Sequence, residues 1–184
     1  MIGICVGHSR KGDQGAYTSG EYSVSEWDFN RDLARRISSV LPVESKIYDD
    51  YELSTYSSAI SRLAKRMKCD GIDVAVELHF NAATPAAHGS EVLYWHSSSK
   101  GKQLANCMQQ AILESFPGTR DRGIKGKEKG ARGSFFLRMT HCPAVLVEPF
   151  FGSNAEDWNT FTNAQQQLGY AYADAVNNFL SDKT

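Results

Sequence analysis

The sequence lacks the features of several common protein classes. Its four cysteines, at positions 5, 69, 107 and 142, form no CxxC pair and no short metal-binding spacing. This pattern excludes a zinc-finger type of site and favours reduced thiols in a chain made in a reducing compartment, while a disulfide stays open. No apolar run approaches the roughly 20 residues that a transmembrane helix requires. We therefore expect no stable insertion into a membrane.

An excess of charge of either sign is also absent. Lys and Arg number 20 against 21 Asp and Glu, which gives a net charge of −1. The chain as a whole therefore gives no reason to expect nucleic acid as a partner. The N-terminal segment 1–6 has no basic region and no cleavage site, so the pattern predicts a strand and not a signal peptide. We expect synthesis in the cytoplasm without a signal peptide.

Apolar strands and amphipathic helices alternate along the chain. The pattern predicts strands at residues 2–6, 45–48, 74–80, 91–95, 135–137 and 144–148, and helices at residues 25–41, 53–67, 98–116 and 164–180. The glycine-rich, basic segment 119–134 is expected to be a loop. This alternation is typical of an α/β layered fold with a largely parallel sheet flanked by helices. Because no linker or internal repeat is present, residues 1–184 are predicted to form one domain.

Polar residues stand at the ends of these apolar segments. His8 follows the first strand, Glu26 begins the first helix, and His79 lies at the exit of segment 74–80. Two imidazoles and a carboxylate are ligands that a catalytic zinc ion uses, with its fourth position left for water. These three residues can therefore supply a zinc site. Each of them taken singly also fits a structural role, and Glu21 is a rival of Glu26, so the residues alone leave this site open.

Glu148 suits a different role. It follows the apolar run Val145–Val147, and surroundings of low polarity raise the pKa of a carboxyl group. Such a carboxylate can take a proton from an attacking water molecule and pass it to a leaving nitrogen. The remaining histidines, His88, His96 and His141, are assigned surface or structural roles because no partner pattern accompanies them.

The order of these motifs resembles that of the zinc-dependent N-acetylmuramoyl-L-alanine amidases, which include cell-wall amidases and phage endolysin domains. The matching segments are Val6–His8 with Asp13–Ala16, Glu26–Asn30 before Leu33 and Ala34, His79–Ala82, Gly89–Tyr94, Arg122–Ile124, Pro143–Glu148, and Phe151–Asn154 with Glu156 and Asp157. They cover nearly the whole chain in the family's order. The chain departs from the family pattern at Ser9 and Arg10, which replace a glycine pair, and at Pro149.

The resemblance implies a fold, a reaction and a set of site residues. The fold would be a twisted sheet of about six strands in one catalytic domain, residues 1–184. The three residues of the candidate zinc site would bind one Zn²⁺ ion, and Glu148 would be the catalytic carboxylate. Asn81 and Arg122 are candidate substrate-binding residues. The reaction would be hydrolysis of the amide between N-acetylmuramic acid and L-alanine in peptidoglycan.

Peptidoglycan is thus the expected partner, and the protein is expected to act as a monomer. A phage or prophage endolysin, made in the cytoplasm and released through holin-type membrane holes, fits this combination best. Two alternatives belong to other classes. A zinc peptidase or deacylase would need the same metal but would cleave another amide. A non-catalytic wall-binding module of the same fold would not depend on Glu148.

Overall fold

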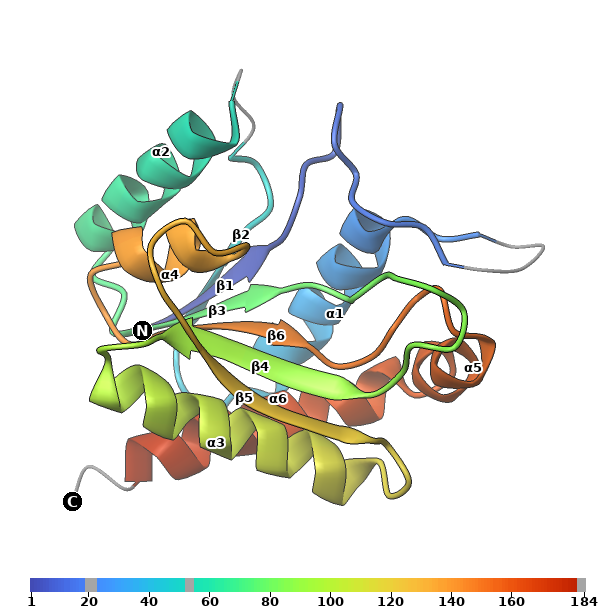
Figure 1. The fold of residues 1–184 in the computed structure, drawn as a ribbon. Helices are drawn as coiled ribbons and strands as arrows, with labels where there is room; N and C mark the ends of the chain where they lie inside the picture. Colours follow the sequence, from blue (N-terminus) through green and yellow to red (C-terminus); the bar gives the residue numbers. More distant parts are fainter. Residues whose placement is uncertain (19–22, 52–54, 182–184) are drawn as a thin grey trace.

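The computed structural model describes residues 1–18, 23–51 and 55–181, which form one six-stranded sheet with helices on both faces (Figure 1). In chain order the elements are β1 (Ile2–Val6), α1 (Glu26–Val40), β2 (Ser45–Tyr48), α2 (Tyr56–Cys69), β3 (Val74–Leu78), β4 (Ser90–Trp95), α3 (Ser99–Ser115), β5 (Asp121–Lys127), α4 (Ser134–Met139), β6 (Ala144–Glu148), α5 (Ala155–Thr162) and α6 (Gln165–Ser181). Within the described part of the chain, no helix has the length and apolar content of a membrane span.

The sheet has the strand order β2-β1-β3-β6-β4-β5. All neighbouring strands are parallel except β4 and β6, which are antiparallel. This confirms the predicted α/β layered fold with a mostly parallel sheet. Val6 lies opposite Leu78, and Leu78 lies opposite Val147, so the carboxyl ends of β1, β3 and β6 are level. Ligand sites of open α/β sheets lie at this edge.

The two faces of the sheet pack against different helices. Alternate residues of β3 pack with α1, α3 and α6, while Ala75 packs with α2 and α4. Leu146 of β6 also lies on the side of α2 and α4. Figure 1 shows these two helices over one face and α3 and α6 over the other. Because side chains alternate every second residue along a strand, Glu77 and Glu148 lie on the side of α2 and α4 as well.

Most predicted elements are found at the expected places. The strands at residues 2–6, 45–48 and 144–148 have the predicted bounds. Helix α1 begins one residue after its N-cap Ser25, whose hydroxyl accepts a hydrogen bond from the backbone N–H of Asp28. The first residues of the predicted helix 53–67 lie outside the described residues, and the described helix begins at Tyr56.

Two predictions for the segments that follow α3 are wrong. The segment 119–134 is not a loop throughout, because Asp121–Lys127 form β5, an edge strand parallel to β4. An edge strand pairs with one neighbour through its backbone and stays half-exposed, so its side chains can be polar. Phe135–Leu137 belong to α4 and not to a strand; three apolar residues are too few to show a period. The sequence pattern also missed α5.

Candidate metal centre

Three side chains meet where the carboxyl ends of β1 and β3 approach the N-terminus of α1. His8 lies two residues past β1, Glu26 is the first residue of α1, and His79 directly follows β3. Their ligand atoms all lie within 4.8 Å of one another. His8 Nε2 is 3.2 Å from Glu26 Oε2, and His79 Nδ1 is 2.9 Å from Glu26 Oε1. The structure thus brings together the three residues that the sequence indicates as ligands.

Glu26 is only 3% exposed, and hydrogen bonds and charges on several sides compensate for the burial of its carboxylate. Its oxygens accept hydrogen bonds from the backbone N–H groups of Ala16, at 2.9 Å, and Phe80, at 3.1 Å. The first turn of a helix also favours a negative charge. Burial alone would raise the pKa of Glu26, but the imidazoles of His79 and His8 hold that pKa well below its ordinary value. The carboxylate is therefore ionised.

Each histidine places one ring nitrogen toward Glu26 and the other toward a second carboxylate. His8 Nδ1 lies 3.2 Å from Asp13 Oδ2, and His79 Nε2 lies 3.5 Å from Glu77 Oε2. Burial alone would lower the pKa of both histidines. The neighbouring carboxylates instead raise the pKa of His8 and raise that of His79 well above its ordinary value. The site therefore favours positive charge.

The donor atoms fit a divalent metal ion. The negative charge of Glu26 can be balanced by protons on the two imidazoles or by a bound metal ion. A metal ion would displace those protons from the ligand nitrogens. Two imidazole nitrogens and one carboxylate oxygen are the donor set of catalytic zinc sites, which keep a further position open. The three residues thus form a group that could hold a divalent metal ion.

The backbone around the site permits close approach of these groups. His8 has a φ of 66°, and no other non-glycine residue in the described ranges has a positive φ. This left-handed conformation costs roughly 1–2 kcal/mol. A Cβ atom added at Gly7 would lie 2.3 Å from His79 Cε1, and one added at Gly15 would lie 2.6 Å from Glu26 Oε2. No larger residue fits at either position unless a candidate ligand moves.

Glu148 lies in the same groove as the two histidines. His8, His79, Asn81 and Glu148 all line a cavity of about 330 Å³. Glu148 Oε2 is buried and forms no hydrogen bond with any described residue. Burial raises the pKa of Glu148 to about 7, with His79 opposing this shift and the Glu26 carboxylate adding to it. A carboxyl group with a pKa near neutrality can both accept and donate a proton.

Glu91 lies directly opposite Glu148 in the antiparallel pair of β4 and β6. Its Oε2 accepts hydrogen bonds from Arg122 Nε at 2.7 Å and Lys125 Nζ at 2.6 Å. The Arg122 guanidinium also lies 4.8 Å from the centre of the Phe151 ring. Arg122 is thus engaged with Glu91 and is not one of the residues that line the groove. Its substrate-binding role, like that of Asn81, stays a prediction.

Asp13, Glu77 and Glu91 are partners of site residues that were not predicted from the sequence. Glu77 could have been identified as unusual from the sequence, because it is the one acidic residue in the apolar segment 74–80. Glu91 begins a predicted strand, but its partners depend on the pairing of β4 with β5.

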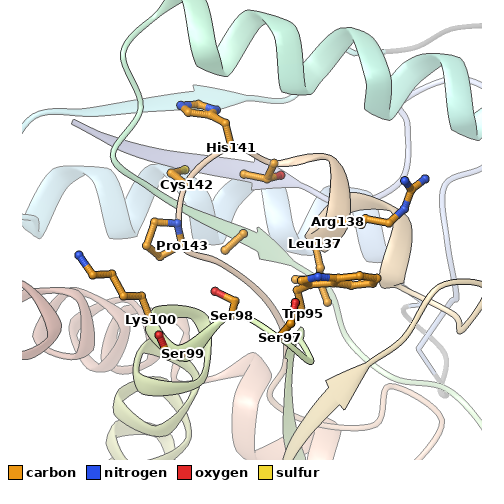
Figure 2. Close-up of a pocket in the computed structure, with 12 residues that line it drawn as sticks. Trp95, Ser97, Ser98, Ser99, Lys100, Leu137, Arg138, His141, Cys142 and Pro143 are labelled. Carbon is orange, nitrogen blue, oxygen red and sulfur yellow. The ribbon is translucent and has the colours of Figure 1, made fainter.

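The other candidate side chains lie elsewhere or are outside the described residues. His141 and Cys142 line a separate cavity of about 410 Å³ with Trp95, next to the first residues of α3 (Figure 2). His88 and His96 are not part of the metal-binding group found among the described residues. Glu21, the rival of Glu26, is outside the described residues.

The model of the N-acetylmuramoyl-L-alanine amidase family matches residues 2–178. The chain belongs to this amidase family. The catalytic domain of the CD27L endolysin targeting Clostridia Difficile is 29% identical, with a TM-score of 0.76 and 96% of each chain covered. The catalytic domain of CwlV, an N-acetylmuramoyl-L-alanine amidase from Bacillus (Paenibacillus) polymyxa, is 26% identical, with a TM-score of 0.80 and 98% of each chain covered.

A third structure shares the fold in a complex. The CwlD amidase from Clostridioides difficile, solved with the GerS lipoprotein, is 20% identical, with a TM-score of 0.84 and 98% of each chain covered. None of the curated protein sequences that were compared matches the chain.

Membership of the family confirms the predicted activity. The amidase hydrolyses the amide between N-acetylmuramic acid and L-alanine in peptidoglycan, so it acts on the bacterial cell wall. The family match and the His-Glu-His cluster both fit a metal-dependent enzyme.

The crowding at Gly15 can be tested against Gly12 in the same loop. Both glycines have a positive φ, of 79° and 93°, so an alanine strains the backbone at either position. Only at Gly15 would the added Cβ meet Glu26 and His8, while nothing lies within 4 Å at Gly12. We expect Gly15→Ala to lower the free energy of unfolding by about 1–3 kcal/mol more than Gly12→Ala. Urea unfolding with a chelator present measures this difference; equal losses would contradict the crowding.

The raised pKa of Glu148 predicts a pH dependence of stability. Its folded pKa of about 7 lies above the ordinary value of 4.5, so the folded state binds the proton more tightly. The resulting stabilisation is complete below pH 4.5 and is lost as the pH rises through 7. From pH 5 to pH 8, wild type should lose about 2.5 kcal/mol of unfolding free energy relative to Glu148→Gln. Urea titrations of both chelated proteins test this; a constant difference would contradict the buried, protonated carboxyl group.

Proposed function

We propose that the amidase is a zinc enzyme in which His8, Glu26 and His79 hold one Zn²⁺ ion and Glu148 is the catalytic carboxylate. Residues 1–184 would form its single catalytic domain. The observation that carries this proposal is the convergence of three ligand atoms within 4.8 Å, beside a buried carboxyl group in the same groove. The chemistry that zinc supplies when bound is polarisation of a carbonyl group and a lower pKa for water.

Glu148 would move the proton during the reaction. Its carboxylate accepts a proton from the water molecule that attacks the carbonyl carbon, and it then donates this proton to the departing amine of L-alanine. A pKa of about 7 suits both steps, because the group is close to half-protonated at neutral pH. Its Oε2 has no hydrogen-bond partner among the described residues and is free to serve this purpose.

The charges around Glu148 support this division of roles. Glu91 is opposite Glu148, and burial would raise its pKa, but Arg122 and Lys125 lower it. Glu91 therefore stays ionised, and its negative charge helps to keep the proton on Glu148. Arg122 and Lys125 thus keep Glu91 ionised, while Glu148, on the opposite strand, can gain or lose a proton near neutral pH.

The proposal predicts how products depend on metal and on Glu148. Purified peptidoglycan treated with wild type should yield new L-alanine amino termini and intact glycan strands, identified by mass spectrometry. A chelator should abolish the release, and added Zn²⁺ should restore it. Glu148→Gln should lower turnover by about 10²–10⁴-fold, while the exposed Glu128→Gln should leave it unchanged.

Other outcomes separate the alternatives. Metal-dependent cleavage inside the stem peptide would identify a zinc peptidase. Zinc binding without any cleavage would contradict the amidase activity and leave a non-catalytic wall-binding module as the alternative. Full activity in the presence of chelator, or in Glu148→Gln, would contradict the proposed site.

We further propose that the protein acts as a monomeric phage or prophage endolysin, made in the cytoplasm and released through holin-type holes. The support is its 29% identity to the catalytic domain of an endolysin over 96% of both chains. Production in bacteria should then cause lysis when a holin is also produced, and no lysis when the holin is absent. Lysis without the holin would contradict this route. Light scattering should give the mass of one chain, and a dimer mass would contradict the monomer.

A further inference from the structure

Glu77 is a buried carboxylate that the proposed reaction does not use. It lies within β3, one of the two innermost strands of the sheet, and only 1% of it is exposed. Removing a carboxylate from water costs several kcal/mol unless a partner compensates. An apolar residue would fill this strand position at no such cost. Its presence therefore points to a specific partner.

Two polar groups near Glu77 are engaged elsewhere. Cys5, its neighbour in the pairing of β1 with β3, directs its thiol to Met67 Sδ at 3.6 Å. The charge of Glu77 helps to raise the pKa of Tyr51, whose hydroxyl donates to the backbone oxygen of Val6. Glu77 Oε2 forms no hydrogen bond of good geometry with the described residues. Its one ion-pair contact there is with His79 Nε2, at 3.5 Å.

The contact divides the two nitrogens of His79 between two carboxylates. Nε2 faces Glu77 at 3.5 Å, and Nδ1 faces Glu26 at 2.9 Å. A proton on one ring nitrogen leaves the lone pair on the other, so the partner of Nε2 decides which nitrogen can bind a metal. Carboxylates that accept the second N–H of a metal-bound histidine fix its tautomer, orient the ring and strengthen the ligand.

We propose that Glu77 is the positioning residue of His79: its carboxylate accepts a hydrogen bond from the Nε2–H group, so that Nδ1 is presented to the metal ion. This inference rests on the proposed zinc site and adds a residue to it. His8 offers a comparison within the same site, since its Nδ1 lies 3.2 Å from Asp13. The Asp13 side chain is 80% exposed, whereas that of Glu77 is 2% exposed. Solvent screens the former pair, so Glu77 has the larger effect.

The test compares zinc affinities by competition with a chromophoric chelator. Glu77→Gln removes the charge at nearly the same volume, and Glu77→Leu removes the acceptor. We expect both to weaken zinc binding by about 10–100-fold, and Asp13→Asn by no more than about fivefold. Wild-type affinity in both Glu77 variants, whatever their stability without metal, would overturn the inference. Failure of wild type to bind zinc would instead overturn the proposed function and this inference with it.

A second measurement needs no variant of Glu77. In zinc-loaded wild type, long-range ¹H–¹⁵N spectra of the histidine rings distinguish the protonated nitrogen from the metal-bound one. Protonated Nε2 and metal-bound Nδ1 on His79 are the expected result. A metal-bound Nε2 with a proton on Nδ1 would overturn the inference even if the variants failed to fold.

Discussion

The site depends on one buried carboxylate, that of Glu26. Its removal from water is compensated by the backbone N–H groups of Ala16 and Phe80 and by the rings of His8 and His79. These partners come from the loop after β1 and from the exit of β3, while Glu26 itself starts α1. Satisfying a single carboxylate therefore fixes how these segments lie relative to one another. The same requirement explains why Gly7 and Gly15 border the site, because a side chain at either position would occupy the space of a candidate ligand.

The fold could be predicted where the signal is local. The apolar run of β1 and the Ser25 cap of α1 each lie within a few adjacent residues, and both appear at the expected place. The edge strand β5 could not be predicted, because backbone pairing with β4 stabilises it and its side chains stay half-exposed. Phe135–Leu137 are apolar because α4 packs on the sheet, and a helix of six residues shows no clear period.

The site could be predicted in its composition but not in its contacts. His8, Glu26 and His79 stand at the ends of predicted elements, and their order along the chain matches the amidase family. The pairing of Arg122 with Glu91 depends on the register of β4 and β5, which no local pattern gives. Which ring nitrogen of a histidine faces Glu26 is likewise a matter of three-dimensional packing.

Anomalous X-ray scattering at the zinc edge, from crystals of the zinc-loaded protein, tests the central claim most directly. We predict one strong peak, bonded to His8, Glu26 and His79 at the roughly 2.0–2.2 Å typical of zinc with nitrogen and oxygen ligands. Glu148 should face this peak across the groove without binding it. A protein that cleaves peptidoglycan with no peak at these residues, or with its metal bound elsewhere, would contradict the account.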